Sequence, residues 1–440
     1  METFKNEQVN STKIHQKQSN IPQIRFKGFN DAWEQRRLGE AFINLQNNTL
    51  SRAELSSGEG KVKNVHYGDL LVIFSEVLNV KKEELPTIKD ESIISKYKES
   101  FLKNGDIVMA DTAEDETVGK CTEIEGLTEE IVISGLHTIP YRPQSKFAPR
   151  YLGYYLNSAY YHDQLLPLTQ GIKVSSISKT SLKSTYISYP KSLVEQGKIG
   201  NFFNYLDHLI TLHQRKCDQL KNIKKSLLEK LFPKNGTLYP ELRFKEFTDA
   251  WEQCKLDEIT NRVLRKNKNL ESELPLTISA QEGLVDQEKF FNKRIASKDL
   301  RNYLLVENGE FAYNKSYSSG YPWGVIKRLD KYPRGVVSSL YIVFSPILDK
   351  IDSSFLVVFF ESELWHSQIS KRAAEGARNH GLLNIQVSDF FDIDLTLSSL
   401  SEQHQIGQFF KDLDNLITLH QRKVEKLKKV KASLLEKMFV

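Results

Sequence analysis

The sequence lacks several features that mark other classes of protein. It has three cysteines in 440 residues, Cys121, Cys217 and Cys254, and neither their number nor their spacing indicates a disulfide framework or a metal cluster. The longest apolar run, Phe355 to Phe360, is far shorter than the roughly 20 residues that a membrane-spanning helix needs. We interpret this run as a buried strand, and we expect a cytoplasmic chain with reduced thiols and no membrane contact.

Signatures of catalysis and nucleotide binding are also missing. No Gly-Lys-Ser or Gly-Lys-Thr occurs, so the sequence has no Walker A phosphate-binding loop. No two prolines are adjacent, as the active loop of an adenine methyltransferase would require. The tripeptide Glu59-Gly60-Lys61 matches the tail of a nuclease signature, but a match this short is expected by chance. We therefore predict no catalytic residue and no metal site.

Positive charge is concentrated in two places. The formal net charge is +5, which by itself is too small to indicate a nucleic-acid partner. Residues 205–234 carry seven basic and three acidic side chains, and residues 411–440 carry eight and four. The rest of the chain is therefore slightly acidic, and the basic excess belongs to these two segments.

The two basic segments are copies of each other. Glu195–Phe232 aligns with Glu402–Phe439 without a gap, at an offset of 207, and 25 of the 38 positions are identical. A second repeat relates Pro22–Leu38 to Pro240–Leu256, with 11 of 17 positions identical at an offset of 218. The long stretches between the repeated blocks share only faint similarity. The chain therefore has two halves, each with an opening motif, a variable region and a copied segment.

Each copied segment predicts a long helix with a narrow apolar seam. Apolar residues recur with alternating spacings of three and four, which is typical of a coiled coil. The predicted seam residues are Leu206, Leu209, Leu220, Ile223 and Leu227 in the first copy and Leu413, Leu416, Leu427, Val430 and Leu434 in the second. His213 and His420 occupy seam positions as polar residues that set the register. The alternative is that each helix packs into its own neighbouring domain.

These patterns together predict an α+β fold with pseudo-two-fold symmetry. Two globular domains of mixed α/β character are separated by two long helices, which form an antiparallel coiled coil about 45 Å long for roughly 30 residues. The expected boundaries are a polar, disordered tail at 1–20, a first domain at 21–194, a first spacer helix at 195–233, a second domain at 234–401 and a second spacer helix at 402–440. In this arrangement Val440 ends near Pro22.

A tryptophan motif, DAWEQ, opens each half at Asp31–Gln35 and Asp249–Gln253. Aromatic residues precede the tryptophan at short spacings among polar neighbours. We expect the motif to form a hydrophobic lid where the domain meets the helix. A direct contact with a partner protein is the alternative.

The repeated motifs resemble those of the specificity subunits of type I restriction-modification enzymes. The RFKxFxDAWEQ segments and the LITLHQRK and SLLEK helices carry this resemblance, which covers roughly Ile21 to Val440. It implies that each variable region is a target recognition domain that reads one half of a bipartite, asymmetric double-stranded DNA site. It also implies a non-catalytic chain that binds no cofactor itself. S-adenosylmethionine, ATP and Mg²⁺ would belong to two methyltransferase subunits and to restriction and translocation subunits.

Polar loops that contain glycine are the candidate DNA-reading loops. Arg and Lys pair with guanine, and Asn and Gln pair with adenine, while glycine permits close backbone approach. The candidates are Gln170, Gly171, Lys173, Ser175 and Ser176 in the first half and Asn314, Lys315, Tyr317, Arg372, Arg378, Asn379 and His380 in the second. For each single residue, an ordinary solvated loop is the alternative interpretation.

Other functions stay open at the level of sequence. The chain could serve a methylation-only or fused-type restriction system, because the nuclease would be a different chain. It could also be a coiled-coil scaffold with two domains for ligands other than DNA, or, against the missing motifs, an enzyme.

Overall fold

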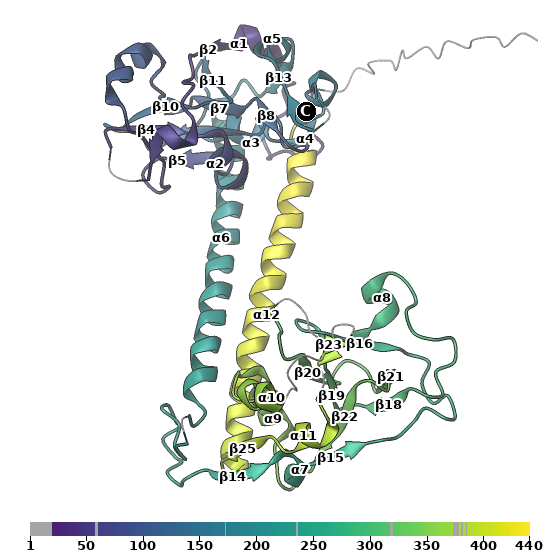
Figure 1. The fold of residues 1–440 in the computed structure, drawn as a ribbon. Coiled ribbons are helices and arrows are strands. Elements are labelled where there is room, and N and C mark those ends of the chain that lie inside the picture. The colour runs from purple at the N-terminus through teal and green to yellow at the C-terminus, as the bar shows by residue number, and fades with distance from the viewer. Residues whose placement is uncertain are drawn as a thin grey trace, which may run out of the picture. The chain divides into compact units, whose positions relative to one another are not determined.

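The computed structural model describes residues 20–57, 60–171, 173–234, 236–316, 320–372, 378–379, 382–383 and 385–440. The chain divides into two compact units. The first unit comprises the chain up to His213 together with Lys423–Val440, and the second comprises Gln214–Arg422. Both units combine helices and strands, which confirms the α+β class (Figure 1). No helix among the described residues is long and apolar enough to span a membrane.

The first unit is built on a five-stranded sheet in the order β2-β11-β7-β9-β5 and a four-stranded sheet in the order β10-β4-β6-β3. Its strands are β1 (Glu34–Arg37), β2 (Phe42–Asn44), β3 (Leu55–Ser56), β4 (Val62–Val65), β5 (Val77–Asn79), β6 (Thr87–Ile88), β7 (Ile107–Ala110), β8 (Thr112–Ala113), β9 (Cys121–Glu125), β10 (Ile131–Ser134), β11 (Thr138–Pro143), β12 (Ser175–Ser176) and β13 (Tyr186–Tyr189). Its short helices are α1 (Leu38–Ala41), α2 (Tyr67–Val72), α3 (Tyr151–Leu156), α4 (Ala159–His162) and α5 (Lys179–Lys183), with 3-10 turns at Arg52–Glu54, Glu91–Ser100 and Leu166–Leu168.

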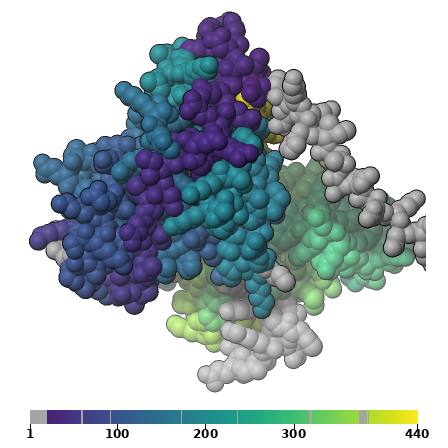
Figure 2. All heavy atoms as spheres, turned by 90° about the horizontal axis from the view of Figure 1, so that it is seen from above, coloured from purple at the N-terminus to yellow at the C-terminus, as the bar shows by residue number. Residues whose placement is uncertain are grey.

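The central strand β7 is apolar throughout because both of its faces are covered. Ile107 and Met109 point into a core that includes α3, whereas Val108 and Ala110 point into a separate core that includes Leu70 of α2. A strand buried on both faces has no reason to alternate polar and apolar residues. The two ends of the domain also meet, since β1 pairs antiparallel with β13. In Figure 2, purple atoms from the early part of the chain accordingly lie against teal atoms from later in the chain.

The second unit repeats this plan around a four-stranded sheet in the order β15-β22-β19-β20. Its strands are β14 (Glu252–Lys255), β15 (Thr260–Val263), β16 (Leu276–Ser279), β17 (Gly283–Asp286), β18 (Leu304–Glu307), β19 (Phe311–Asn314), β20 (Val325–Arg328), β21 (Arg334–Val337), β22 (Ile342–Pro346), β23 (Arg378–Asn379), β24 (Leu382–Leu383) and β25 (Asp394–Leu397). Its short helices are α7 (Leu256–Ile259), α8 (Gln287–Phe291), α9 (Ser353–Glu361), α10 (His366–Arg372) and α11 (Val387–Phe391). Here β14 pairs with β25 as β1 pairs with β13.

The apolar run Phe355–Phe360 forms most of helix α9, so its interpretation as a strand is wrong. Asp352 starts the helix, because its carboxylate accepts hydrogen bonds from the backbone amides of Ser354 and Phe355. Five of the six residues in the run are buried, so this helix is covered on almost every side. A helix enclosed in this way shows no apolar periodicity that would distinguish it from a buried strand.

The two copied segments form the long helices α6 (Leu193–Lys230) and α12 (Leu400–Lys437). In the first unit, Asp207 early in α6 contacts Lys431 late in α12. In the second unit, Lys224 late in α6 contacts Asp414 early in α12. Each unit therefore pairs the helices in opposite directions, which confirms the predicted antiparallel arrangement.

The observed seam departs from the predicted one by a single residue at several positions. Predicted residues Leu206, Leu220 and Leu413 are buried, and Leu209, Leu227, Leu427 and Leu434 are half-buried. However, Ile223, Leu416 and Val430 are 47%, 46% and 39% exposed, which corrects the prediction. Their neighbours Lys224, Ile417 and Lys431 face inward instead. The spacing of apolar residues could not identify these seam positions, because two of the three inward-facing side chains are lysines held by ion pairs.

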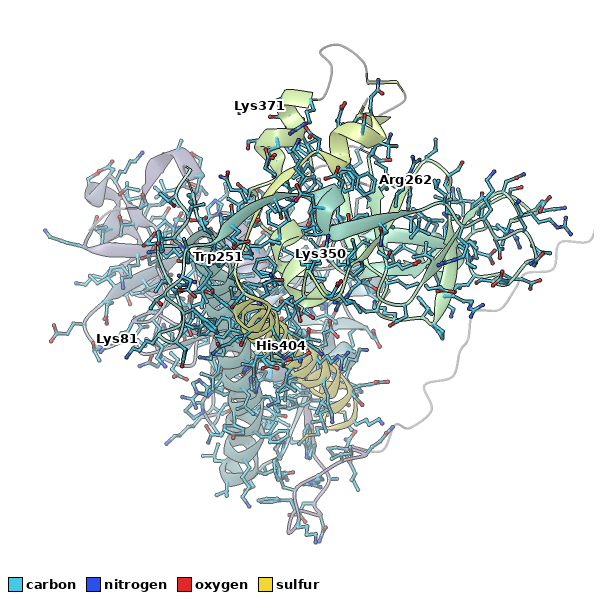
Figure 3. All side chains as sticks on the ribbon, turned by 90° about the horizontal axis from the view of Figure 1, so that it is seen from below. Lys81, Trp251, Arg262, Lys350, Lys371 and His404 are labelled. Atoms are coloured by element: carbon cyan, nitrogen blue, oxygen red, sulfur yellow. The ribbon has the colours of Figure 1, made fainter. Side chains whose placement is uncertain are left out.

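The tryptophan motif packs against the end of a long helix in both units. Trp33 is 2% exposed, and its ring centroid lies 6.3 Å from that of Phe439. Trp251, labelled in Figure 3, is 1% exposed, and its centroid lies 6.0 Å from that of Phe232. Phe232 and Phe439 are equivalent residues of the helix repeat. The expected lid between domain and helix is thus present twice.

The start and end of the described chain meet in the first unit. The backbone amide of Ile24 donates to the carbonyl of Lys437 at 3.0 Å, and the equivalent bond in the second unit joins Leu242 to Lys230 at 2.9 Å. In the second unit the chain is continuous through this junction. We therefore expect a circular permutant that joins Val440 to residue 20 and opens after Pro233 to fold.

The permutant is expected to unfold cooperatively within a few degrees of the parent chain, as measured by circular dichroism. A matched permutant opened between Val108 and Met109 should fail, since it breaks a strand buried on both faces. Aggregation of both permutants would contradict the expected tolerance of the first opening.

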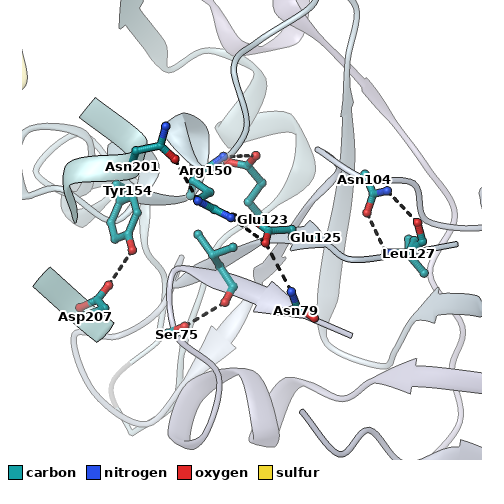
Figure 4. Close-up of polar contacts among 12 residues, drawn as sticks. Ser75, Asn79, Asn104, Glu123, Glu125, Leu127, Arg150, Tyr154, Asn201 and Asp207 are labelled. Atoms are coloured by element: carbon teal, nitrogen blue, oxygen red, sulfur yellow. Dashed lines mark hydrogen bonds and ion pairs between the residues drawn. The ribbon is translucent and has the colours of Figure 1, made fainter. Parts of the chain in front are cut away.

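A buried carboxylate caps helix α3 in the first unit (Figure 4). Glu123 accepts hydrogen bonds from the backbone amides of Arg150 at 2.6 Å and Gly153 at 2.9 Å. Its side chain is almost completely removed from solvent, and this burial raises its pKa from 4.5 to about 7 against the effect of those two bonds. Between these pH values the folded chain holds a proton that the unfolded chain has released.

Stability from this group is therefore expected to fall as the pH rises from about 4.5 to about 7, by roughly 2–3 kcal/mol. Glu123→Gln cannot titrate and should remove this part of the pH dependence. Thermal unfolding midpoints of both chains at pH 5 and pH 7.5 measure it. Parallel pH profiles for the two chains would show that Glu123 does not titrate in this range.

Candidate nucleic-acid interface

In the first unit, the two ends of the candidate loop 169–176 pair with each other, and its strand β12 pairs with β8, which follows β7. Gln170 and Ser176 exchange two backbone hydrogen bonds, of 2.9 and 2.8 Å. Strand β12 in this loop pairs with β8, so that Ser176 faces Thr112 and Ser175 faces Ala113. The main chain of the loop is therefore held in place, while the side chains of Gln170 and Ser176 are exposed.

Gly171 and Lys173 have different roles in this loop. Gly171 has a φ of +118°, and a Cβ atom there would collide with the carbonyl oxygen of Val174. The turn itself thus requires glycine, independently of any approach of DNA. Lys173 is exposed near the tip of the same loop, where its charge is accessible.

In the second unit, Lys315 contacts the segment that pairs with Arg378 and Asn379, since β24 pairs antiparallel with β23. The amide of Leu383 donates to the carbonyl of Lys315 at 2.9 Å, and Lys315 Nζ donates to the carbonyl of Ile385 at 3.1 Å. Burial lowers the pKa of Lys315. Asn314 accepts a bond from the amide of Ser316, so both predicted residues help to shape their own loop.

The remaining candidates of the second unit divide into three groups. Arg372 donates to both the carboxylate and the carbonyl of Asp392 at 2.8 Å, so its guanidinium is engaged within the domain. Arg378 and Asn379 form the short strand β23, and only their backbone is described. Tyr317 and His380 lie outside the described residues. Lys371, at the end of α10, is exposed (Figure 3).

The two units place these loops at equivalent points of the fold. Asp111 directly follows the central strand β7, and Lys315 directly follows β19. Each residue's carbonyl accepts a bond from a residue next to a candidate loop, from Ile177, which follows β12, at 2.8 Å and from Leu383 of β24, which pairs with β23, at 2.9 Å. Unlike sequences therefore build the same junction in both domains.

Around this junction, the first unit carries polar residues that the sequence did not reveal. His137 has a φ of 55°, and its Nδ1 atom lies 3.3 Å from Asp111 Oδ1 and 3.5 Å from Thr112 Oγ1. The Tyr67 ring lies 5.3 Å from the His137 ring. Nearby, Asn47 donates to the carbonyl of Gly135 at 3.2 Å and accepts from Lys179 Nζ at 3.2 Å.

We name this set, with the candidate loop, the β7 surface; it consists of Asn47, Tyr67, Asp111, Thr112, His137, Gln170, Lys173, Ser175, Ser176 and Lys179. The surface combines hydrogen-bond donors and acceptors that are partly or fully exposed. Such groups can bind the edges of bases and the phosphates beside them. Residues about 30 to 65 positions apart in the sequence come together here through strand pairing. No local sequence motif could therefore predict this surface.

Comparison with known proteins identifies similar chains. The sequence model of a family described as "Type I restriction modification DNA specificity domain" matches residues 30–222 and 286–429. The MjaVIII specificity subunit of a type I restriction enzyme from Methanocaldococcus jannaschii is 23% identical over 284 residues, which are 61% of this chain and 64% of that protein. A provisionally named MjaX specificity subunit from the same organism is 29% identical over 176 residues, 40% of each chain.

The chain thus spans between two fifths and just under two thirds of the length of these curated relatives. Among solved structures, the S subunit of a type I restriction-modification system from M. genitalium superposes with a TM-score of 0.57 at 15% identity. That alignment covers 96% of this chain and 99% of the other. At 15% identity, this similarity shows a shared fold and nothing further.

Proposed function

Because the chain belongs to the type I restriction-modification DNA specificity family, we propose that it is the sequence-reading subunit of such a complex. In this proposal, residues 21–194 and 234–401 are the two target recognition domains, and each reads one half of a bipartite DNA site. The observation that most supports this proposal is that two domains of unlike sequence form the same loop junction after β7 and β19. Unlike side chains at equivalent junctions would read unlike half-sites.

The β7 surface is the part of the first domain that would contact bases. A good bidentate pair of hydrogen bonds to a base edge discriminates a correct from an incorrect base by about 1–3 kcal/mol. The second domain would use the junction of β19 with β23 and β24 in the same way. In the first domain, the glycine turn at Gly171 holds the main chain so that the exposed side chains beside it are presented.

The long helices would dock the partner subunits. Apolar side chains are exposed at equivalent positions of both copies: Leu212 and Leu419 are 52% and 46% exposed, and Ile223 and Val430 are 47% and 39% exposed. Exposed apolar residues repeated in this way favour a partner that binds once per copy. The proposed partners are two methyltransferase subunits, which would bind S-adenosylmethionine. Restriction and translocation subunits would supply ATP and Mg²⁺ chemistry, and the chain itself would hold no cofactor.

A DNA footprint of the chain together with its methyltransferase subunits tests this function. The expected result is two protected blocks separated by a spacer of fixed length. The chain alone, incubated with DNA and labelled S-adenosylmethionine, should transfer no methyl group. One uninterrupted protected block, or methyl transfer by the chain alone, would refute the proposed role.

Replacing both Thr112 and His137 with alanine is expected to weaken recognition of one half-site by about tenfold or more, because two base-edge contacts would be lost. Recognition of the other half-site should not change. Competition binding with DNA altered in one half-site at a time measures both effects.

Lys81→Ala is the matched control for this double variant. Lys81 is exposed and follows β5, whose last residue lies beside Glu125 at the end of the sheet opposite Asp111. It should bind both half-sites as the parent chain does. An equal loss at both half-sites in the double variant would show that the β7 surface carries no sequence preference.

A further inference from the structure

A largely buried lysine in each unit joins both long helices to the globular domain. In the first unit, Lys431 Nζ lies 2.6 Å from Asp207 Oδ1 and 2.7 Å from Glu76 Oε1. Lys431 belongs to α12, Asp207 belongs to α6, and Glu76 precedes β5 in the domain. One ammonium group thus contacts three separate parts of this unit.

The second unit contains the same junction. Lys224 Nζ lies 2.6 Å from Asp414 Oδ1 and 2.7 Å from Glu361 Oε2, the latter at the end of α9. The lysines and aspartates of the two junctions are equivalent in the helix repeat. The two glutamates are not equivalent, since one lies in a loop before a strand and the other ends a helix.

Two unlike domains therefore supply a carboxylate to the same helix lysine from different places in their folds. Common ancestry of the helices accounts for the lysine and the aspartate, but it does not account for the glutamates. The recurrence indicates that the contact between domain and helix pair has a role of its own, beyond the pairing of the helices.

The charges at the junction restrict how the domain can be oriented on the two helices. The lysine side chains are only 13% and 17% exposed. Burial by itself would lower the pKa of Lys431, but Glu76 and Asp207 outweigh this effect, and the pKa is raised. The lysine therefore stays charged and must keep both carboxylates close. Leucine would also fill the space, but it would not fix the orientation of the domain.

Further contacts hold the carboxylates in place. In the first unit, Tyr154 Oη donates to Asp207 Oδ2 at 2.6 Å (Figure 4), and Lys431 Nζ lies 5.3 Å from the centre of the Tyr154 ring. In the second unit, Lys327 Nζ lies 3.4 Å from Glu361 Oε1. Both oxygens of one carboxylate in each junction thus have a partner.

We propose that Lys431 and Lys224 are positioning residues that fix the orientation of each recognition domain on the helix pair, and through it the spacing at which the two half-sites are read. This inference rests on the proposed function. A domain that rotates on its helices would still bind its half-site, but it would accept a different separation from the other half-site.

Glu76→Gln tests this inference because it weakens only the contact to the domain and leaves Lys431 paired with Asp207. The full chain, assembled with its methyltransferase subunits, is given a library of sites whose spacer is lengthened or shortened by single base pairs. We expect the preference for the native spacer over its neighbours to fall by about tenfold, since small misplacements of reacting groups have large effects on rate. The exposed Glu84→Gln is the matched control and should keep the preference.

Glu361→Gln asks the same question in the second unit, and should also relax the spacer preference. If both variants methylate all sites more slowly but keep the native preference, or if they lose only thermal stability, the lysines are structural and the inference is wrong. If the unaltered complex methylates no bipartite site, the proposed function fails as well. A native preference in the unaltered complex, kept in both variants, would overturn the inference alone.

Discussion

Replacement of Trp33 by alanine is expected to lower the free energy of unfolding by about 3–5 kcal/mol. The indole is 2% exposed and packs at 6.2 Å from the Tyr151 ring and 6.3 Å from the Phe439 ring, centre to centre. Alanine would leave a cavity where the opening motif, the domain and the end of α12 meet. The two surrounding rings belong to separate segments, α3 and the end of the chain after α12, so they cannot collapse together to fill it. Urea denaturation followed by fluorescence and circular dichroism measures the loss.

A matched exposed aromatic residue separates this effect from a general effect of removing a ring. Tyr205, early in α6, is 59% exposed, and Tyr205→Ala should change the free energy of unfolding by about 0.5 kcal/mol or less. Trp251→Ala should repeat the large loss in the second unit, because Trp251 is 1% exposed and packs on Phe232 and Phe355. A loss below about 1 kcal/mol for Trp33→Ala would contradict the lid.

The second large effect is expected at the ion pair between the opening motif and the start of α6. Arg25 Nε and Nη2 donate to the two carboxylate oxygens of Glu195 at 2.6 and 2.9 Å, and the side chains are only 10% and 1% exposed. Arg25→Leu would leave the buried carboxylate without its cation. We expect it to destabilise the chain by about 3–5 kcal/mol. The double variant Arg25→Leu/Glu195→Leu should recover much of this loss, since no charge stays buried.

Arg36→Leu is the control for this pair. Arg36 also bonds a glutamate, Glu34, but its side chain is 51% exposed. Solvent-exposed ion pairs contribute about 0–1 kcal/mol, so its loss should be small. If Arg25→Leu and Arg36→Leu had equal effects, the buried pair would not be a main connection between motif and helix. The same pair recurs as Arg243 with Glu402 in the second unit.

The long helices and their antiparallel pairing were predictable because they depend on periodic, repeated residues. The repeat of Asp207 and Lys224 at Asp414 and Lys431 makes an antiparallel pair self-consistent. The exact seam was not predictable from apolar spacing, because the inward-facing residues include lysines. Only the carboxylates that contact them, two of which come from the domains, show why a lysine is tolerated there.

Helix α9 illustrates a second limit of prediction from sequence. A short apolar run carries no periodicity, so a buried helix and a buried strand look alike. Asp352 was the available signal, since an aspartate just before such a run is a typical helix start. A strand formed by Phe355–Phe360 would not need a capping residue such as Asp352 at its start.

The candidate interface was predictable only in part. The loops containing Gln170 and Lys315 were identified from their polar, glycine-bearing composition. Thr112 and His137 were not, because they join Ser176 and Asp111 through strand pairing across the domain. The left-handed backbone at His137 is likewise invisible in the sequence. The base preferences of Arg378 and Asn379 stay a prediction.

Sequencing of methylated adenines in a host that carries the complete system tests the central claim most directly. If this chain is a two-domain DNA reader, methylation will occur at one bipartite motif with two different half-sites and a spacer of constant length. Exchanging residues 21–194 for another recognition domain should then change one half-site and leave the other unchanged. A single uninterrupted motif, two identical half-sites, or methylation that does not depend on this chain would contradict the account.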